Sequence, residues 1–258
     1  MDDDALRRAI ARHAWFHSIP LRPGIVTPGG KPLGQLEAEC HALLGPLDLT
    51  GRSVLDIGAW NGFFSLAAKR RGAARVTAVD RYTWQHPDYL GRQTLELCRR
   101  ELGLEIEMRE LDAEDLPADL GRFEVVLFLG IFYHLVDPLS VLAAVASMTE
   151  RVLVIETHQD ALSEARPAMI HYPDRELDGD PSNWWGPNPE AVYQLLRQHG
   201  FGPIYYQDHP LCAPAGPWPL RRRGMYHAFR GVPDDLVVGS PAWLDMADPT
   251  VRQALVLS

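Results

Sequence analysis

The feature that most constrains the fold is an alternation of short apolar strands and amphipathic helices that begins at Ser53. Short apolar segments separated by amphipathic helices predict a parallel sheet, because each helix must bury its apolar stripe against the strands. The fold class is therefore predicted to be α/β and Rossmann-like, with helices on both faces of the sheet. The strand patterns stand at 53–58, 74–80, 104–110, 123–130 and 151–157, and the helical patterns at 62–72, 87–103 and 137–149.

The segments on either side of this alternation have weaker patterns. An acidic N-cap at Asp2–Asp4 predicts a helix to about Phe16, and a loop rich in proline and glycine separates it from a second helix that begins near Gln35 and stops at Gly45–Pro46. After the fifth strand we expect a helix at 188–200 and an antiparallel pair of strands at one edge, 201–208 and 224–231, joined by a proline-rich loop. The pattern over 232–258 is too weak to assign.

Composition excludes several classes of protein. With 258 residues and 46% hydrophobic content the chain can bury one sizeable core, and its net charge of −9 disfavours a nucleic-acid partner. The three cysteines form no zinc or disulfide framework, so we expect a reducing cytoplasm. We expect neither a signal peptide nor a membrane span, because no segment has the required apolar run.

The first strand pattern runs into a glycine turn, Asp56-x-Gly58-x-x-x-Gly62, which opens a helix. Gly58 lets the backbone turn sharply, and Gly62 lets the helix begin close to the strand. A dinucleotide is favoured by G-x-G-x-x-G, which leaves room for a pyrophosphate at the helix N-terminus, whereas this loop carries the indole of Trp60. The loop therefore favours a ligand without phosphate, and Asp56 suits an ammonium group.

Two further acids follow neighbouring strands. Asp80 ends the second strand, where an acid binds the hydroxyls of a ribose. Asp112 follows the third strand and can accept from an adenine amino group, while the backbone N–H of Ala113 donates to a ring nitrogen. An amine, a ribose and an adenine without phosphate indicate S-adenosylmethionine, with S-adenosylhomocysteine as product. Trp60 is then expected to border the methionine part, and Arg81 joins the predicted cofactor residues.

Longer stretches resemble a known family. "VLDIGAWNGFFSLAAKRRGAARVTAVD" resembles the glycine motif of class I S-adenosylmethionine-dependent methyltransferases. "FLGIFYHLVDPLSVL", "VLVIET" and "NWWGPNPEAVYQLLRQHGF" resemble the tRNA wobble-uridine 5-oxyacetate methyltransferases and their small-molecule relatives, and "WFHSIPL" and "GIVTPG" resemble a leader of those relatives. The resemblance covers about Trp15 to Tyr206. It implies a seven-stranded, mostly parallel sheet, with the last strand antiparallel beside the fifth and an N-terminal helical and loop lid.

The resemblance also assigns residues to the reacting side. In the family, the tyrosine at the position of Tyr133 contacts the side of the cofactor that carries the transferred methyl group. Leu129, four residues earlier, is also predicted to bind the cofactor. The superfamily builds its acceptor pocket after the fifth strand, which makes Trp184 and Trp185 pocket walls or core residues. His17 in the leader either closes over the site or lies on a surface loop. The predicted domains are 1–48, helices and lid loop, 49–231, the methyltransferase domain with an acceptor-pocket insertion over 157–188, and 232–258, a tail.

A hydroxyl acceptor needs a base. His134 follows the fourth strand and is placed either as that base or as a histidine that caps the turn or bonds the backbone. Glu156, His158 and Asp160 alternate after the fifth strand, where they form either a base and acceptor-binding group or a polar strand end. A metal site is the weaker alternative, and no metal is predicted.

The upstream basic residues that hold the extra carboxylate in the carboxy-S-adenosylmethionine enzymes have no recognisable equivalent here, so we expect the ordinary cofactor. The predicted function is methylation of a small molecule, on oxygen first and nitrogen next, in secondary metabolism. A tRNA wobble-uridine methyltransferase and a non-catalytic cofactor-binding domain are the alternatives. The predicted partner is the small-molecule acceptor, and a homo-oligomer is left open.

Overall fold

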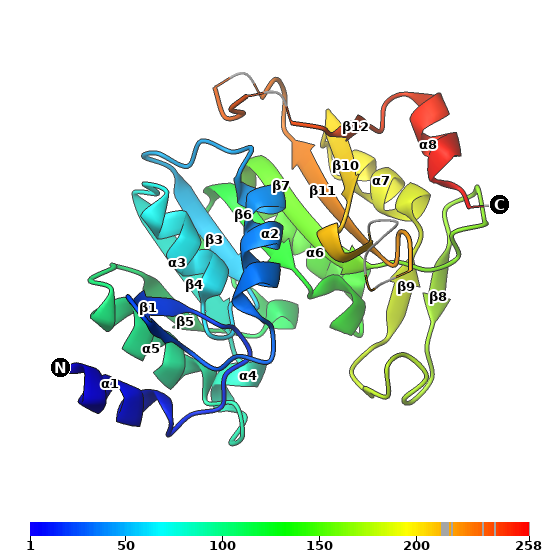
Figure 1. Cartoon of the computed structure of the whole chain (residues 1–258). Coiled ribbons are helices and arrows are strands. Elements are labelled where there is room, and N and C mark those ends of the chain that lie inside the picture. Colours follow the sequence, from blue (N-terminus) through cyan, green and yellow to red (C-terminus); the bar gives the residue numbers. More distant parts are fainter. Residues whose placement is uncertain (213–216, 218, 234, 240, 258) are drawn as a thin grey trace. The chain divides into compact units, whose positions relative to one another are not determined.

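The predicted alternation of strands and helices is present in the computed structural model, which describes residues 1–212, 217, 219–233, 235–239 and 241–257 (Figure 1). The chain divides into two units, one made of Met1–Leu44 with Leu49–Ala113 and the other of Gly45–Asp48 with Glu114–Ser258. The predicted α/β, Rossmann-like fold class is confirmed, with strands flanked by helices. The predicted domain boundaries remain a prediction.

The first unit carries three parallel strands in the order β3-β4-β5. Their bounds are β3 Ser53–Ile57, β4 Arg75–Asp80 and β5 Glu107–Glu110. Residues in β3 and β4 are almost all buried, as expected of parallel strands covered by helices. The other elements are α1 Asp3–Ile10, β1 Pro20–Arg22, β2 Ile25–Val26, α2 Leu33–Leu44, α3 Phe63–Arg70, α4 Tyr82–Gln85 and α5 Gly91–Glu101.

Two helices of this unit differ from prediction. Asp2 caps α1 as expected, with its side chain accepting from the backbone N–H of Ala5 at 2.7 Å, but the helix ends at Ile10 and not near Phe16. The buried Trp15 indole N–H donates to the carbonyl of Ile10 at 2.9 Å, so a side chain satisfies an end carbonyl that a further turn would have bonded. The helix predicted at 87–103 begins only at Gly91.

The second unit carries five strands in the order β12-β10-β11-β7-β6. Their bounds are β6 Phe123–Leu129, β7 Thr149–His158, β10 Ile204–Asp208, β11 Arg223–Phe229 and β12 Leu244–Asp245. β7 runs parallel to β6, whereas β11 is antiparallel to both β7 and β10. This confirms the antiparallel pair and the placement of the last long strand beside the fifth.

The prediction of seven strands was wrong by one. The two units contribute three and five strands in the described part of the chain, and the additional one is β12, which pairs with β10 in the segment whose pattern was too weak to assign. The same segment forms α8, capped by Asp248. The predicted proline-rich loop at 209–223 includes residues 213–216 and 218, which lie outside the described residues.

The remaining helices begin at polar caps followed by proline. Asp137 caps α6, Pro138–Met148, and Asn188 caps α7, Pro189–Gln198. The insertion predicted over 157–188, for which no element was assigned, contains a hairpin of β8 Met169–His171 and β9 Trp185–Pro187. Short 3₁₀ turns lie at Ala113–Asp115, Ala118–Leu120, Phe132–His134 and Pro210–Cys212, and α8 spans Pro249–Leu255. No described helix has both the length and the apolar character needed to span a bilayer.

Candidate functional site

The glycine turn of the first unit depends on three left-handed residues. Gly58, Trp60 and Gly62 have φ angles of 75°, 49° and 81°. The backbone N–H of Gly58 donates to the carbonyl of Val79 at 2.8 Å, which ties the turn to β4. A Cβ at Gly62 would lie 2.2 Å from the Leu95 side chain, so glycine is needed there for α3 to pass α5.

Asp80 holds this turn from the end of β4. Its side chain is 6% exposed, and its two oxygens accept backbone N–H bonds from Trp60 at 3.0 Å and from Thr83 at 2.9 Å. Burial raises the pKa of Asp80, and these hydrogen bonds oppose the rise. Each carboxylate oxygen has a further lone pair, so the predicted bonds to a ribose remain compatible with this arrangement.

Asp56 is buried on β3 and has a protein partner. The hydroxyl of Ser65 on α3 donates to its Oδ2 at 2.5 Å. Burial raises the pKa of Asp56 to about 6, although the bonds from Ser65 lower it and the charge of Asp80 adds to the rise. Asp56 is therefore mostly ionised at neutral pH, as binding an ammonium group requires.

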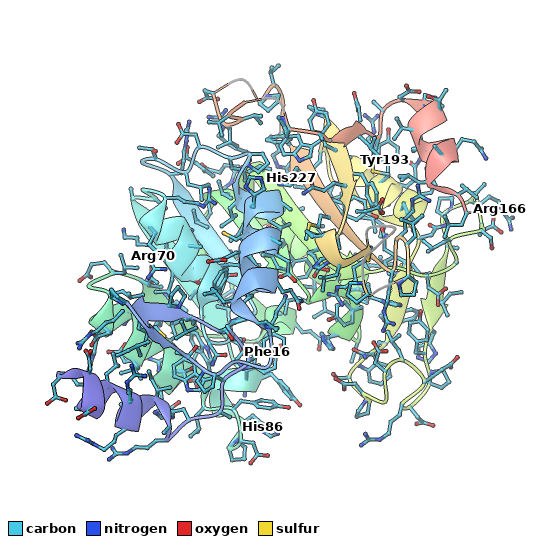
Figure 2. All side chains as sticks on the ribbon, viewed as in Figure 1. Phe16, Arg70, His86, Arg166, Tyr193 and His227 are labelled. Carbon is cyan, nitrogen blue, oxygen red and sulfur yellow. The ribbon has the colours of Figure 1, made fainter. Side chains whose placement is uncertain are left out.

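The leader is anchored to the glycine turn by a residue that the sequence did not single out. The side-chain oxygen of the fully buried Asn61 accepts from the backbone N–H groups of Phe16 at 2.9 Å and His17 at 3.1 Å. Its amide donates to the Thr94 hydroxyl on α5 at 2.6 Å. The Phe16 ring, labelled in Figure 2, stacks on Trp60 at 4.0 Å between centroids. Asn61 follows Trp60 in a turn, where asparagine is common, so its role gave no sequence signal.

His17 is buried rather than displayed on a surface loop. Only 6% of it is exposed, and its Nδ1 has no hydrogen-bond partner among the described residues. Burial lowers the pKa of His17 to about 3, with Lys31 lowering it further and Glu39 opposing. The imidazole is therefore neutral, and its predicted closing role stays a prediction.

The other predicted cofactor residues lie where the strand ends place them. Arg81 is exposed and precedes α4, and Asp112 and Ala113 are half-buried after β5. In the second unit Leu129 is half-buried at the end of β6, and Tyr133 follows in a 3₁₀ turn.

The second unit contains a cluster of polar side chains at the end of β7. Arg223 of β11 forms a bidentate ion pair with the buried Glu156 of β7, including a bond of 2.8 Å from Nη2 to Oε2. Both terminal nitrogens of Arg223 also donate to the Tyr133 hydroxyl at 3.3 Å. Burial opposes the charge of Arg223, but Glu156 outweighs it and holds the pKa well above its ordinary value. Arg223 is the last residue of the basic run Arg221–Arg223, and nothing in the sequence placed it in a buried cluster.

Two histidines of this unit have defined partners. Nε2 of His158 lies 3.0 Å from the Tyr172 hydroxyl, which in turn donates to Asp160. Nδ1 of His134 lies 3.0 Å from the backbone carbonyl of Ser182. Burial lowers the pKa of both imidazoles, that of His158 to about 4.

The segment expected to wall the acceptor pocket is tied to Tyr133. The backbone N–H of Trp184 donates to the Tyr133 carbonyl at 2.8 Å, and Trp185 begins β9. Both indoles are half-buried near the His171 ring, with centroids 6.1 Å and 5.1 Å away. The indole N–H of Trp185 is buried with no partner among the described residues.

Over the described ranges, no group of three His, Cys, Asp or Glu side chains is arranged to hold a metal ion. Two of the three residues that alternate from Glu156 to Asp160 have charged or hydroxyl partners: Glu156 pairs with Arg223, and Asp160 accepts from Tyr172.

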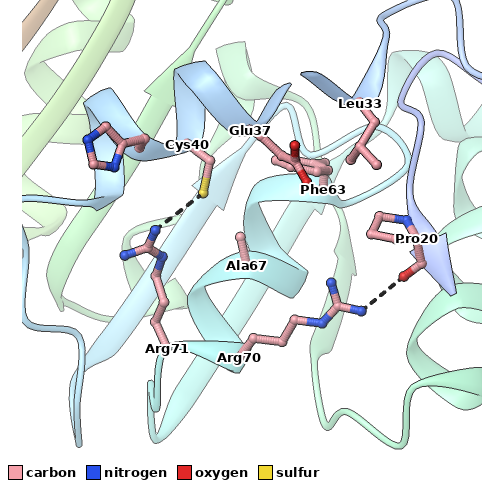
Figure 3. A pocket seen from close by; sticks show the side chains of 9 residues that line it. Pro20, Leu33, Glu37, Cys40, Phe63, Ala67, Arg70 and Arg71 are labelled. Atoms are coloured by element: carbon pink, nitrogen blue, oxygen red, sulfur yellow. Dashed lines mark hydrogen bonds between the residues drawn. The ribbon is translucent and has the colours of Figure 1, made fainter. Parts of the chain in front are cut away.

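A separate pocket of about 250 Å³ lies in the first unit beside α2 and α3 (Figure 3). Arg70 donates across it to the carbonyl of Pro20 at 3.0 Å, and Arg71 lies 3.9 Å from the Cys40 sulfur. None of the predicted cofactor or acceptor residues lines this pocket, so it is distinct from the predicted site.

The known proteins whose sequences are similar to this chain are methyltransferases. The methyltransferase domain family matches residues 34–205. The tRNA U34 carboxymethyltransferase of Pseudomonas putida (strain W619) is 29% identical over 165 residues, 63% of this chain and 49% of that protein. The ubiquinone biosynthesis O-methyltransferase of Stutzerimonas stutzeri (strain A1501) is 35% identical over 108 residues, 40% of this chain and 42% of that protein. The chain thus spans about half the length of the curated relatives it matches.

Solved structures share the fold. The N-terminal domain of EvdMO1, crystallised in the presence of S-adenosylhomocysteine and D-fucose, has a TM-score of 0.60 at 20% identity, over 89% of this chain and 97% of that one. Magnesium protoporphyrin IX methyltransferase from Synechocystis PCC 6803, with bound S-adenosylhomocysteine, has a TM-score of 0.54 at 16% identity, over 76% and 83%. With its glycine turn, its strand order and the match over 34–205, the chain belongs to the methyltransferase domain family and has the class I, Rossmann-like fold.

Proposed function

We propose that this chain transfers the methyl group of S-adenosylmethionine to a small-molecule acceptor, with a hydroxyl as the favoured acceptor group. The observation that carries the proposal is the glycine turn of the first unit. There an ionised Asp56, a glycine turn that carries the Trp60 indole in place of a third glycine and the strand-end Asp80 match an amine and a ribose without phosphate. Family membership and the S-adenosylhomocysteine named in the related structures support this cofactor.

In methyl transfer the main task of the protein is to position the acceptor and the cofactor, because the sulfonium is already a good leaving group. The S–CH₃ bond breaks with its electron pair staying on sulfur, and a bond forms from the acceptor oxygen to the methyl carbon, which favours in-line positioning and exclusion of water. The hydroxyl proton must pass to a base, for which His134 and His158 are the two candidates. Both are neutral at physiological pH because burial lowers their pKa.

A small acceptor is favoured by the composition of the second unit near the end of β7. The cluster there is aromatic and internally ion-paired, and Arg222 is paired with Asp178, so the basic run does not form an open cationic surface. Ring-sized ligands suit such a lining better than a polyanion does. A tRNA acceptor is the second candidate, favoured by the similarity to the tRNA U34 carboxymethyltransferases.

Calorimetric titration with S-adenosylmethionine, S-adenosylhomocysteine and NAD tests the cofactor. We expect the first two to bind and NAD not to bind. Asp80→Asn should weaken binding by about 1–3 kcal/mol, because it removes charge-assisted bonds to the ribose. Asp88→Asn, at a side chain that is 83% exposed, is the matched control and should bind normally. Absence of heat with both sulfur ligands would refute the proposal.

Release of S-adenosylhomocysteine with a panel of hydroxylated and aminated acceptors then identifies the acceptor class. For a hydroxyl acceptor, replacing the histidine that serves as base with alanine should lower turnover by about 100-fold without changing cofactor affinity. Full activity in both His134→Ala and His158→Ala would show that no histidine base is needed, and would favour a nitrogen acceptor.

A further inference from the structure

We propose that Tyr172 and Asp160 form a relay that fixes the tautomer of His158, so that Nδ1 of its imidazole is the proton acceptor in the methyl transfer. The assignment of His158 as the base rests on the proposed function. The relay itself rests on the geometry of the second unit. Tyr172 and Asp160 act through His158 and are therefore positioning residues.

The Tyr172 hydroxyl has a single proton to donate. Tyr172 is 5% exposed, and its hydroxyl contacts two groups, the carboxylate of Asp160 and Nε2 of His158 at 3.0 Å. An ionised carboxylate can only accept, so the hydroxyl donates its proton to Asp160. Burial, then Asp160, raises the pKa of Tyr172, so the phenol keeps that proton at physiological pH.

Because the hydroxyl proton points at Asp160, the hydroxyl oxygen can only accept from His158, and Nε2 must carry a hydrogen. A neutral imidazole carries one ring proton, which leaves Nδ1 with its lone pair. No described group hydrogen-bonds to Nδ1 in the structure. The nitrogen that can take a proton is therefore fixed by a hydrogen bond on the opposite side of the ring.

The local backbone is arranged around this relay. The second oxygen of Asp160 accepts from the backbone N–H of Ala161 at 2.6 Å, and Ala161 takes a left-handed φ of 49°. A Cβ at Gly186 of β9 would lie 2.5 Å from the Tyr172 hydroxyl and 2.8 Å from the Asp160 Cβ. Glycine at 186 thus leaves the space in which the phenol and the carboxylate meet.

The carboxylate of Asp160 also supplies the negative charge that stabilises a protonated His158. When Nδ1 takes the acceptor proton, the ring becomes an imidazolium whose Nε2–H is bonded to a hydroxyl anchored on a carboxylate, an arrangement that stabilises the positive charge. The proton then leaves to solvent and the neutral ring is restored. The titratable and charged groups that face His158 are Arg223 of β11, Arg222 just before that strand, Asp160, Asp178, Tyr172 and the Tyr133 ring.

Nuclear magnetic resonance tests the relay without any substrate. In the full chain labelled with ¹⁵N-histidine, long-range ¹⁵N–¹H spectra identify which ring nitrogen of His158 is protonated, and His158→Gln assigns the signal. We expect the Nε2–H form in the native protein. Tyr172→Phe should lose this single tautomer, whereas Tyr205→Phe, at a half-buried tyrosine of β10, should keep it. An Nδ1–H form, or a Tyr172→Phe spectrum identical to the native one, would overturn the relay.

A second variant keeps the test independent of Tyr172. Asp160→Asn retains an acceptor oxygen but removes the charge, so the titration of His158 should shift to lower pH, because Asp160 raises its pKa. An unchanged or higher midpoint would contradict the relay. Failure of the proposed function would look different, since a chain that binds no S-adenosylmethionine can still show the Nε2–H tautomer. With an acceptor in hand, Tyr172→Phe should lower kcat roughly 10-fold with little change in KM.

Discussion

At the scale of single residues, Asp56 illustrates how a group proposed to bind the cofactor can oppose folding. Its carboxyl has a pKa raised to about 6 by burial, against an ordinary value of 3.8. The folded chain then holds this proton more tightly than the unfolded chain. Stability is therefore lost as pH rises through the interval between the two values, and the full cost, about 3 kcal/mol, applies above it.

Asp56→Asn should accordingly stabilise the ligand-free protein by up to about 3 kcal/mol at neutral pH. The gain should disappear below pH 3.8, where the native carboxyl is protonated in both states. Urea unfolding at several pH values measures it, with Asp88→Asn as the exposed control. The same variant should bind S-adenosylmethionine more weakly, because the partner of the ammonium group is neutral. Destabilisation of equal size at every pH would contradict the burial argument.

At the scale of elements, the start of α3 depends on close passage beside α5. Gly62 has a left-handed φ of 81° and faces the Leu95 side chain, so an added Cβ meets both backbone strain and a steric conflict. Gly103 after α5 has a φ of 63° and no neighbour within 4 Å of an added Cβ, so it carries the backbone strain alone.

Gly103→Ala should therefore cost about 1–2 kcal/mol, the usual penalty of a left-handed alanine. Gly62→Ala should cost about 1–3 kcal/mol more, because Leu95 must move within a packed core. Chemical denaturation of the two variants gives the difference directly. Equal losses would show that α5 relaxes freely and that the loop does not need glycine for packing.

The register of strand pairing also decides which side chains of the second unit lie close enough to form an ion pair. Arg223 stands opposite His158 in the β7–β11 register, and Met225 stands opposite Glu156, so the ion pair of Arg223 and Glu156 runs diagonally across the two strands. Diagonal neighbours on one sheet face lie within reach of long side chains. The register thus places Arg223, the last residue of the basic run Arg221–Arg223, in a buried polar cluster.

At the scale of the whole molecule, charge separates the small-molecule proposal from the tRNA alternative. Attraction to a polyanion draws on several Lys or Arg contacts acting together and falls steeply with salt, and the chain has a net charge of −9. We expect no salt-sensitive binding in a mobility-shift titration with total tRNA at low salt. We also expect no label on tRNA from a strain that lacks wobble modification. Tight binding with label at a wobble uridine would establish the tRNA activity instead.

By itself the sequence determined the parts of this protein that depend on local pattern. The strand and helix alternation from Ser53, the glycine turn at Asp56–Gly62 and the strand-end acid Asp80 could all be read from residue order, because strand burial, turn conformation and helix starts are set by neighbouring residues. Even here the end of α1 and the presence of β12 were beyond prediction, since the folded position of the Trp15 side chain decided the first and pairing with β10 decided the second.

Only the tertiary structure decided which side chains meet. Asn61 reaches the leader across 44 and 45 residues, Arg223 reaches Glu156 across 67, and Tyr172 meets His158 and Asp160 through the β8–β9 hairpin that the sequence did not predict. The physical reason is that a hydrogen bond or ion pair is fixed by distance in space. A sequence shows which donors and acceptors exist, and the register of strands and the turn of a loop determine which of them lie about 3 Å apart.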